Sequence, residues 1–345
     1  MLSPKTAYRC RGILLLAFLV IIGRPALAQT ATVAFYNVEN LFDTQDDSLK
    51  QDEEFLSYGV RGWTSSRLRA KYHGIYKVIA GLGDIEQPPA LVGLAEVENR
   101  AVLEGLLRHT PLHRWRYRIV HEESPDRRGI DVALLYDPEQ FRYLSHEAVP
   151  VDLGSLSDRP TRDILYVRGV LFGSDTVHCF INHWPSRYGG VSSSAPRRQR
   201  AAAVLQTRIR ALQQECPDAL IILTGDFNDG PTEVSMRKLI EANETGSPLV
   251  NISQYACAGT HKYQGAWSTF DQFIVTDNLL NGKRIRVKGG TARCYRPDWL
   301  AEEDVNHLGF RPRRTYVGYH YHGGFSDHWP VYLQLQRESA EVAEK

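Results

Sequence analysis

The sequence has little net charge, few cysteines and no pattern of metal-binding cysteines. In 345 residues the basic and acidic side chains nearly cancel, leaving a formal charge of +1. A chain with so small a charge has no overall field that gathers nucleic acid, so a polyanionic substrate needs a local basic patch or a metal ion. None of the five cysteines lies in a zinc-ligand spacing. Composition therefore neither supports nor excludes nucleic acid, and it gives no indication of zinc.

Long apolar runs are also absent, with one exception near the start of the chain. Residues 13–22 are apolar, follow Lys5, Arg9 and Arg11, and precede small residues that end at Ala28. This order predicts a secretory signal peptide over residues 1–28. The run is shorter than the roughly 20 residues that span a bilayer. We therefore expect an exported protein, periplasmic or extracellular, with no membrane span after cleavage and a formal charge of −3, because cleavage removes four basic and no acidic residues.

No low-complexity linker and no internal repeat divides the rest of the chain. We expect one domain over residues 29–337 and a solvated, charged tail over residues 338–345. Exported proteins meet oxidising conditions, and Cys257 and Cys294 lie in polar, loop-like segments, so these two are the expected disulfide pair. Cys179 lies in a strand-like run and is expected to be a buried thiol.

Strand-like and helical patterns alternate along the chain. Strands are predicted at residues 32–36, 90–94, 116–120, 132–136, 165–172, 177–181, 220–223, 268–276, 285–288 and 331–336, and the clearest helices at residues 64–82, 97–109 and 196–215. This mixture favours an α/β or α+β protein built from sheets packed under helices.

The most informative stretch is the apolar run 219–223 followed by Thr-Gly-Asp-Phe-Asn-Asp-Gly-Pro at 224–231. A buried strand that ends here places Asp226 and Asn228 on the same side, since they are two residues apart. A carboxylate beside an amide suits a site that activates water and holds an oxyanion. The alternative is a helix start or a turn, because Asp and Asn also cap helices and Gly-Pro favours turns.

Polar residues stand at the ends of several other apolar runs as well. They are Asn37, Glu96, His183, Asp271, Asp327 and His328. Oxygen ligands without a Cys/His cluster indicate a hard divalent cation, Mg²⁺ or Mn²⁺. Histidines beside carboxylates then indicate phosphoester hydrolysis, in which the metal ion clamps the phosphoryl oxygens.

These motifs, in the order Asn37, Glu96, His183-Trp-Pro, Gly-Asp-Phe-Asn at 225–228, Asp271 and Ser-Asp-His at 326–328, resemble those of the endonuclease/exonuclease/phosphatase family. The resemblance covers nearly the whole chain after residue 28 and is closest to a secreted bacterial-type member. It implies the deoxyribonuclease I-like fold, a four-layer sandwich of two packed mixed β-sheets flanked by helices.

The resemblance also implies roles for individual residues. Glu96 would be the principal metal ligand, with Asn37 and Asp327 beside it. Asp226 would orient or deprotonate the attacking water, and Asn228 would hold a phosphate oxygen.

Two histidines would contact the scissile phosphate from opposite sides. His328 would be oriented by Asp271, and His183 would be paired with its own carboxylate, for which Asp131 is the candidate. The residues after His183 form a basic, glycine- and serine-rich loop in which Arg187 is the candidate for binding a second phosphate.

The predicted activity is that of an exported Mg²⁺- or Mn²⁺-dependent phosphodiesterase, an endonuclease-like enzyme on DNA or RNA. One alternative keeps this machinery but acts on inositol phosphates, phospholipids or sphingomyelin, since related folds change substrate through their loops. A second alternative is a binding protein with the same fold and no turnover. A monomer is the default expectation.

Overall fold

The computed structural model describes residues 29–83, 87–241, 246–254 and 257–337. The predicted signal peptide and the predicted C-terminal tail lie outside these ranges. Within them, no helix combines the length and apolar character needed to cross a membrane.

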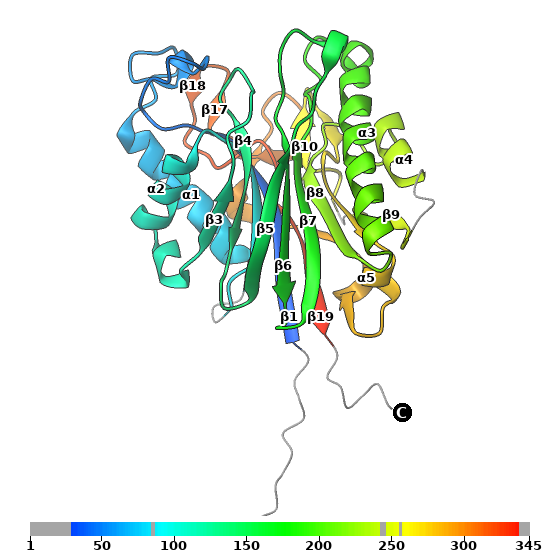
Figure 1. The fold of residues 1–345 in the computed structure, drawn as a ribbon. Helices are drawn as coiled ribbons and strands as arrows, with labels where there is room; N and C mark the ends of the chain where they lie inside the picture. The colour runs from blue at the N-terminus through cyan, green and yellow to red at the C-terminus, as the bar shows by residue number, and fades with distance from the viewer. Residues whose placement is uncertain (1–28, 84–86, 242–245, 255–256, 338–345) are drawn as a thin grey trace, which may run out of the picture.

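Two mixed β-sheets form the centre of the molecule (Figure 1). The first contains, in spatial order, β13 (Ile285–Val287), β19 (Val331–Arg337), β1 (Gln29–Leu41), β2 (Leu91–Val97), β4 (Asp131–Tyr136) and β3 (Arg118–His121), with β14 (Arg293–Cys294) also paired to β19. The second contains β5 (Phe141–Val149), β6 (Ile164–Leu171), β7 (Asp175–His183), β8 (Leu220–Asp226), β12 (Asp271–Thr276) and β9 (Leu249–Asn251). Each sheet has one parallel pair, β1 with β2 and β7 with β8.

Helices cover the outer face of each sheet, and short hairpins extend from one end. The α-helices are α1 (Ser65–Leu82), α2 (Arg100–His109), α3 (Val191–Glu215), α4 (Val234–Glu241) and α5 (Asn278–Asn281). The hairpins are β10 (His261–Tyr263) with β11 (Ala266–Ser268), β15 (Ala301–Glu303) with β16 (Phe310–Pro312), and β17 (Tyr316–Val317) with β18 (His320–Tyr321). In Figure 1, α1 and α2 lie on one outer side and α3 and α4 on the other.

Three apolar layers hold this arrangement together. The central layer includes Phe35, Val167 and Leu333 from the facing sides of the two sheets. A second layer packs α1 and α2 against the first sheet, and a third packs α3 and α4 against the second. The order helix, sheet, sheet, helix confirms the predicted four-layer α/β sandwich.

The predicted helices are present, but their starts differ from the prediction. α1 begins at Ser65, one residue late, because Thr64 caps it. α2 begins at Arg100 rather than at residue 97, because Val97 still pairs with Asp131 in the sheet and Asn99 caps the helix by accepting from the Val102 N–H at 2.9 Å. α3 begins at Val191, five residues before the predicted start.

The strand predictions differ from the structure in two ways. The predicted strand 268–276 is divided, because β11 turns back onto β10 and β12 starts where Asp271 pairs with Asp226. Several strands were not predicted. The edge strand β5 was missed because polar residues interrupt its alternation, and the others are the short strands β9, β10 and β14 to β18.

The cysteine predictions have different outcomes. Cys179 is a buried thiol on β7, as predicted. Cys257 and Cys294 are neighbours, but both are free thiols, so the predicted disulfide is wrong for this structure. A hydrogen bond joins the two side chains instead and lowers the pKa of Cys257 to about 7.

The topology brings the carboxyl ends of four strands to one end of the sandwich. β1 and β2 run parallel, as do β7 and β8, and Asn37 contacts Asp226 across the two sheets, so Asn37, Glu96, His183 and Asp226 all lie in the carboxyl-terminal parts of their strands on that side. Figure 1 shows β10, β17 and β18 at the same end, opposite the start of β1 and the finish of β19. The candidate site therefore lies at this end.

One pH effect on stability arises far from this end. His178 on β7 is buried and contacts the Tyr166 hydroxyl through Nδ1 at 2.8 Å. Burial, with the nearby Arg168 and Arg208, lowers the pKa of His178 to about 4. Because the unfolded chain binds this proton more tightly, the stabilising effect is complete above pH 6.5 and is lost as the pH falls towards 4.

We expect this single group to reduce the free energy of unfolding by about 2 kcal/mol at pH 5 relative to pH 7.5. The measurement is urea unfolding of the wild type and His178→Gln at both pH values, with the exposed His73→Gln as control. If the wild type and His178→Gln show the same pH dependence, the assignment of a depressed pKa to His178 is wrong.

Candidate active site

Three polar side chains from three strands meet at the end of the sandwich. Asn37 of β1 donates from Nδ2 to Glu96 Oε1 at 3.3 Å and to Asp226 Oδ2 at 3.1 Å. Asn37 and Asp226 are buried, and Glu96 is partly exposed. The Asn37 oxygen accepts from the backbone N–H of Glu39 at 3.0 Å. Asn37, which is predicted to be a metal ligand, orients the two carboxylates through its amide.

The backbone around these residues is strained. Four non-glycine residues have positive φ: Glu39 (51°), Asn40 (58°), Glu96 (63°) and Asn228 (52°). The pairing of β1 with β2 is also irregular between Asn37 and Leu41. Such conformations cost about 1–3 kcal/mol each and cluster at functional sites. Here they turn the Glu96 carboxylate inward, where its Oε2 accepts from the Asn40 N–H at 3.0 Å.

The turn after β8 decides between the two interpretations of the Gly-Asp-Phe-Asn motif. Asp226 ends the strand, and its Oδ1 accepts from the Asn228 N–H at 2.9 Å. No helix begins here, since α4 starts at Val234. Asn228 Nδ2 donates to the Trp184 carbonyl at 3.1 Å, which holds the amide beside Asp226. The motif is therefore a strand end that presents a carboxylate and an amide.

Two histidines lie on either side of Asp226. Its Oδ2 is 3.8 Å from Nε2 of His183 and 3.8 Å from Nε2 of His328. Burial, reinforced by the Asp271 carboxylate and opposed by His328, raises the pKa of Asp226 to about 7. A carboxyl group with this pKa accepts and returns protons near neutral pH.

His328 is held by Asp271, as predicted. Its Nδ1 donates to Asp271 Oδ2 at 2.7 Å. Burial lowers the pKa of His328, but the carboxylates of Asp271 and Asp226 outweigh it and raise this pKa well above the ordinary value. Ser326 fixes the backbone, since its Oγ accepts from the His328 N–H at 3.1 Å and donates to the Asn37 carbonyl at 2.7 Å. His328 is therefore an oriented imidazolium.

The predicted partner of His183 is wrong. Asp131 accepts from His121 Nε2 at 3.1 Å and from the Ser124 N–H at 2.9 Å, because β3 and β4 form a hairpin that places His121 beside it. Among the described residues, His183 Nδ1 has no hydrogen-bond partner. Burial lowers the pKa of His183 well below the ordinary value, and the positive charges of Arg162, Arg128 and His328 add to this effect. The His183 side chain is therefore neutral.

Asp327 belongs to a partly buried network that the sequence did not reveal. Its Oδ2 accepts from Arg314 Nη2 at 2.9 Å, and Arg314 Nε donates to Glu39 Oε1 at 3.3 Å. Although burial raises the pKa of Asp327, Arg314 and the neighbouring histidines lower it to about 2. The charge that makes Asp327 a candidate metal ligand is thus permanently present.

The cation that completes this network is Lys71 of α1. Its Nζ donates to the Phe325 carbonyl at 2.6 Å, and the side chain is 2% exposed. Burial lowers the pKa of Lys71 to about 8, and the same effect raises the pKa of Glu39 to about 7. The attraction between the two charges opposes both shifts but does not cancel the effect of burial.

We expect Lys71→Ala to lower the free energy of unfolding by about 3 kcal/mol, because it leaves the buried Glu39 carboxylate without one of its cations. Urea unfolding at pH 7.5 measures this, and Lys77→Ala on the exposed face of the same helix is the matched control. A loss no larger than that of the control would show that the buried Lys71 charge does not stabilise the fold.

His261 is a third histidine at the site, and the sequence analysis missed it. It opens β10 and pairs with His328 through an isolated bridge, with ring centroids 4.7 Å apart. Its Nε2 is 3.8 Å from Asp327 Oδ2. Its position at the start of a short strand was the only sequence feature that pointed to it. That feature gains meaning in the folded chain, where the β10–β11 hairpin lies beside His328.

Arg187, the candidate for binding a second phosphate, has its charge already engaged. Nε donates to the Asn228 carbonyl at 2.8 Å, and Nη2 donates to Asp229 at 3.2 Å and to Glu233 at 3.3 Å. Its guanidinium lies 4.8 Å from the centre of the Phe270 ring. The guanidinium therefore forms part of the wall beside the site, and its contact with a second phosphate stays a prediction.

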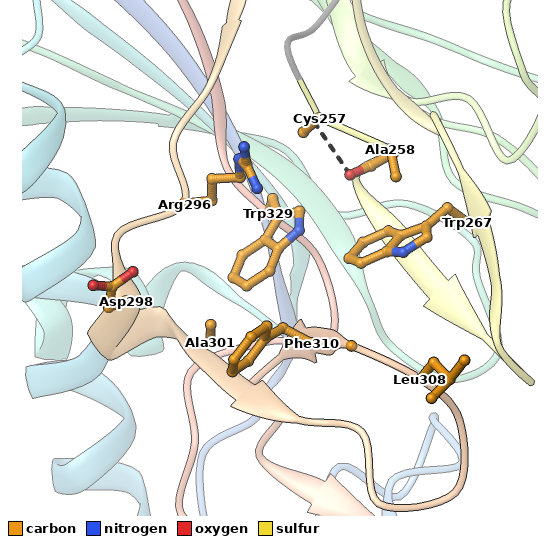
Figure 2. Close-up of a pocket in the computed structure, with 11 residues that line it drawn as sticks. Cys257, Ala258, Trp267, Arg296, Asp298, Ala301, Leu308, Phe310 and Trp329 are labelled. Carbon is orange, nitrogen blue, oxygen red and sulfur yellow. Dashed lines mark hydrogen bonds between the residues drawn. The ribbon is translucent and has the colours of Figure 1, made fainter.

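A separate cavity of about 560 Å³ lies behind the segment that carries His328. Figure 2 shows Trp329 and Trp267 lining it, with Arg296 and Phe310 nearby. The backbone N–H of Trp329 donates to the Thr260 carbonyl at 2.7 Å, so a backbone hydrogen bond joins this segment to the residue before β10. None of the predicted catalytic residues lines this cavity, so it is separate from the catalytic site.

The chemistry of the donor set fits a divalent cation. Glu96, Asp226 and Asp327 present carboxylate oxygens, and repulsion from Asp271 and Glu96 contributes to the raised pKa of Asp226. A bound cation would relieve this repulsion. In the described part of the chain, the ligand atoms of two groups lie within 4.8 Å of one another: His261, Asp327 and His328, and His121, Glu123 and Asp131.

The sequence matches the model of a known family over residues 32–337, described as the endonuclease/exonuclease/phosphatase family. The chain belongs to this family. Its members are phosphoester hydrolases that generally depend on a divalent metal ion, which supports phosphoester hydrolysis as the reaction of this site. No curated protein sequence matches the chain significantly.

Solved structures of the family share the fold at low sequence identity. A family protein from Bacteroides thetaiotaomicron is 16% identical with a TM-score of 0.57, covering 90% of this chain and 96% of that one. A mannosyl-6-phosphatase from the same species is 17% identical with a TM-score of 0.55, covering 88% and 99%. TDP2 from D. rerio, complexed with a single-strand DNA product, is 14% identical with a TM-score of 0.54, covering 89% and 98%. These likenesses establish the fold.

Proposed function

We propose that the protein is an exported, Mg²⁺- or Mn²⁺-dependent phosphodiesterase that cleaves nucleic acid. The observation that carries this proposal is the position of Asp226 Oδ2, 3.8 Å from Nε2 of both His183 and His328. A buried base between a neutral and a cationic imidazole suits in-line attack on a phosphate.

The residues divide the work of hydrolysis. Asp226 accepts a proton from the attacking water, and Asn37 keeps its carboxylate in place. The His328 imidazolium, oriented by Asp271, stabilises negative charge on the phosphoryl oxygens. His183 contacts the phosphate as a neutral imidazole.

Glu96 is the principal candidate to hold the cation, with Asp327 as the second carboxylate. When bound, the cation would act as a Lewis acid on the phosphoryl oxygens. Asp327 would first have to share its oxygen with Arg314, which holds it at 2.9 Å.

The choice of nucleic acid rests on the phosphodiester chemistry of the predicted site and on the neighbour that carries a DNA product. The neighbour named as a mannosyl-6-phosphatase represents the competing class, phosphomonoesters. The signal-like sequence at residues 1–28 supports export.

A substrate panel tests the proposal. The chain without residues 1–28 is incubated with Mg²⁺ or Mn²⁺ and plasmid, single-stranded DNA, RNA, sphingomyelin, inositol phosphates and a bis-aryl phosphate. Turnover of DNA or RNA is expected. Turnover of phosphomonoesters alone would replace the nuclease with a phosphatase, and absence of all turnover together with unchanged metal binding in Glu96→Ala would indicate a non-catalytic protein.

A further inference from the structure

A cavity of about 690 Å³ adjoins the catalytic residues on the side of Asn228 and His261. One wall is the segment from Ser186 to Val191 that leads into α3, and the other is the β10–β11 hairpin with Tyr263. Asn228 and His261 line it, so the cavity borders the residues assigned to the scissile phosphate.

Three aromatic side chains, Tyr188, Tyr263 and Phe270, line the cavity. Tyr188 and Tyr263 stand on opposite walls with 77% and 63% of their surface exposed. Phe270 is buried between them and stacks with His261, with ring centroids 5.5 Å apart and planes 22° apart. Exposed rings around a buried ring provide flat apolar surfaces for another ring.

The cavity does not offer a free cation at its aromatic wall. The Arg187 guanidinium lies flat on Phe270, and its hydrogen bonds go to Asp229, Glu233 and the Asn228 carbonyl. Asp229 is also paired with the buried Arg198 at 2.7 Å. Two arginines and two carboxylates thus neutralise one another, and a second phosphate gains little from this wall.

We infer that this cavity binds a nucleobase next to the scissile phosphate, which makes unpaired nucleotides the preferred substrates. The inference rests on the proposed function and specifies its substrate class. Stacking accepts any base because every base has a flat π-face, and a volume of 690 Å³ suits a single ring system with its sugar. A paired base is already stacked within its duplex and is not available to this cavity.

Binding without turnover tests the inference independently of catalysis. Equilibrium dialysis in EDTA compares thymidine 5′-monophosphate with 2-deoxyribose 5-phosphate, which carries the same phosphate and sugar without the base. We expect the nucleotide to bind at least about tenfold more tightly, and Tyr188→Ala and Tyr263→Ala each to remove about fivefold of this preference. Both tyrosines are exposed, so these variants retain the fold. Tyr58→Ala, at 78% exposure outside the cavity, is the matched control and should bind like the wild type.

Hydrolysis provides the second arm. With Mn²⁺, oligothymidylate should be cleaved at least about tenfold faster, in kcat/KM, than a chain of the same length made of abasic residues. Equal binding of the two monophosphates, or tyrosine variants that match Tyr58→Ala, would overturn the inference. Equal cleavage of the two chains would overturn it as well while leaving phosphodiesterase activity intact. Absence of hydrolysis with base-dependent binding preserved would instead refute only the proposed function.

Discussion

Asp226→Asn is expected to lower kcat about 10³-fold and to leave KM within about threefold of the wild type. The asparagine keeps the shape of the side chain and its position beside Asn37 and Asn228, but it cannot accept a proton from water. Asp226 is 2% exposed and lies between two imidazoles. Among the described residues of the site, no other carboxylate has these two contacts, so none can replace it as the base. Steady-state kinetics on single-stranded DNA measure the effect.

The control for this substitution is Asp218→Asn, an exposed aspartate before the same strand, which should keep kcat within about twofold. Thermal unfolding of both variants separates a loss of chemistry from a loss of fold. A tenfold or smaller decrease in kcat for folded Asp226→Asn would mean that Asp226 is not the base.

His328→Gln is expected to lower kcat by about 10²- to 10³-fold, the usual effect of removing one stabilising group from a developing oxyanion. The raised pKa of His328 keeps this side chain cationic, and glutamine retains a hydrogen-bond donor but not the charge. The exposed His320→Gln on β18 is the matched control and should not change kcat.

Asp271→Asn tests whether Asp271 acts by orienting the His328 imidazole. The His328–Asp271 hydrogen bond of 2.7 Å fixes the imidazole, so its loss should lower kcat more than it raises KM. A change in KM alone would contradict the orienting role of Asp271.

For His328→Gln, kinetics equal to those of the wild type would show that the imidazolium does not contact the reacting phosphate.

The sequence predicted the parts of the site that depend on strand ends. Asn37, Glu96, His183 and Asp226 follow short apolar runs, and parallel pairing of those runs brings their ends together. The contact of Asp271 with His328 was also predicted correctly, through the family resemblance.

Other contacts depend on registers and turns that a local pattern does not fix. Asp131 pairs with His121 because of the β3–β4 hairpin register, which no short motif encodes. Arg314 and Glu39 are 275 residues apart in sequence and meet only in the folded chain. Arg187 illustrates the same difficulty, since its sequence context is basic but its folded neighbours are Asp229 and Glu233.

The strain in the backbone was likewise invisible in the sequence. Glutamate rarely adopts positive φ, and asparagine adopts it at only a minority of positions, so the conformations of Glu96 and Asn40 were not predictable from residue type. These conformations arise where β1 and β2 change register, and they aim the principal candidate metal ligand into the site. The backbone conformation that the residue types favour differs here from the one that the site requires, and such differences are typical of functional sites.

The most direct test is a metal titration of the catalytic site. Protein stripped with EDTA is titrated with Mg²⁺ or Mn²⁺ while hydrolysis of single-stranded DNA is followed, in parallel with Glu96→Ala. We predict no hydrolysis before metal is added, saturable hydrolysis afterwards, and a loss of both activity and metal affinity in Glu96→Ala. Hydrolysis by the stripped protein, or a Glu96→Ala variant with the metal affinity and kcat of the wild type, would contradict the assignment of this site.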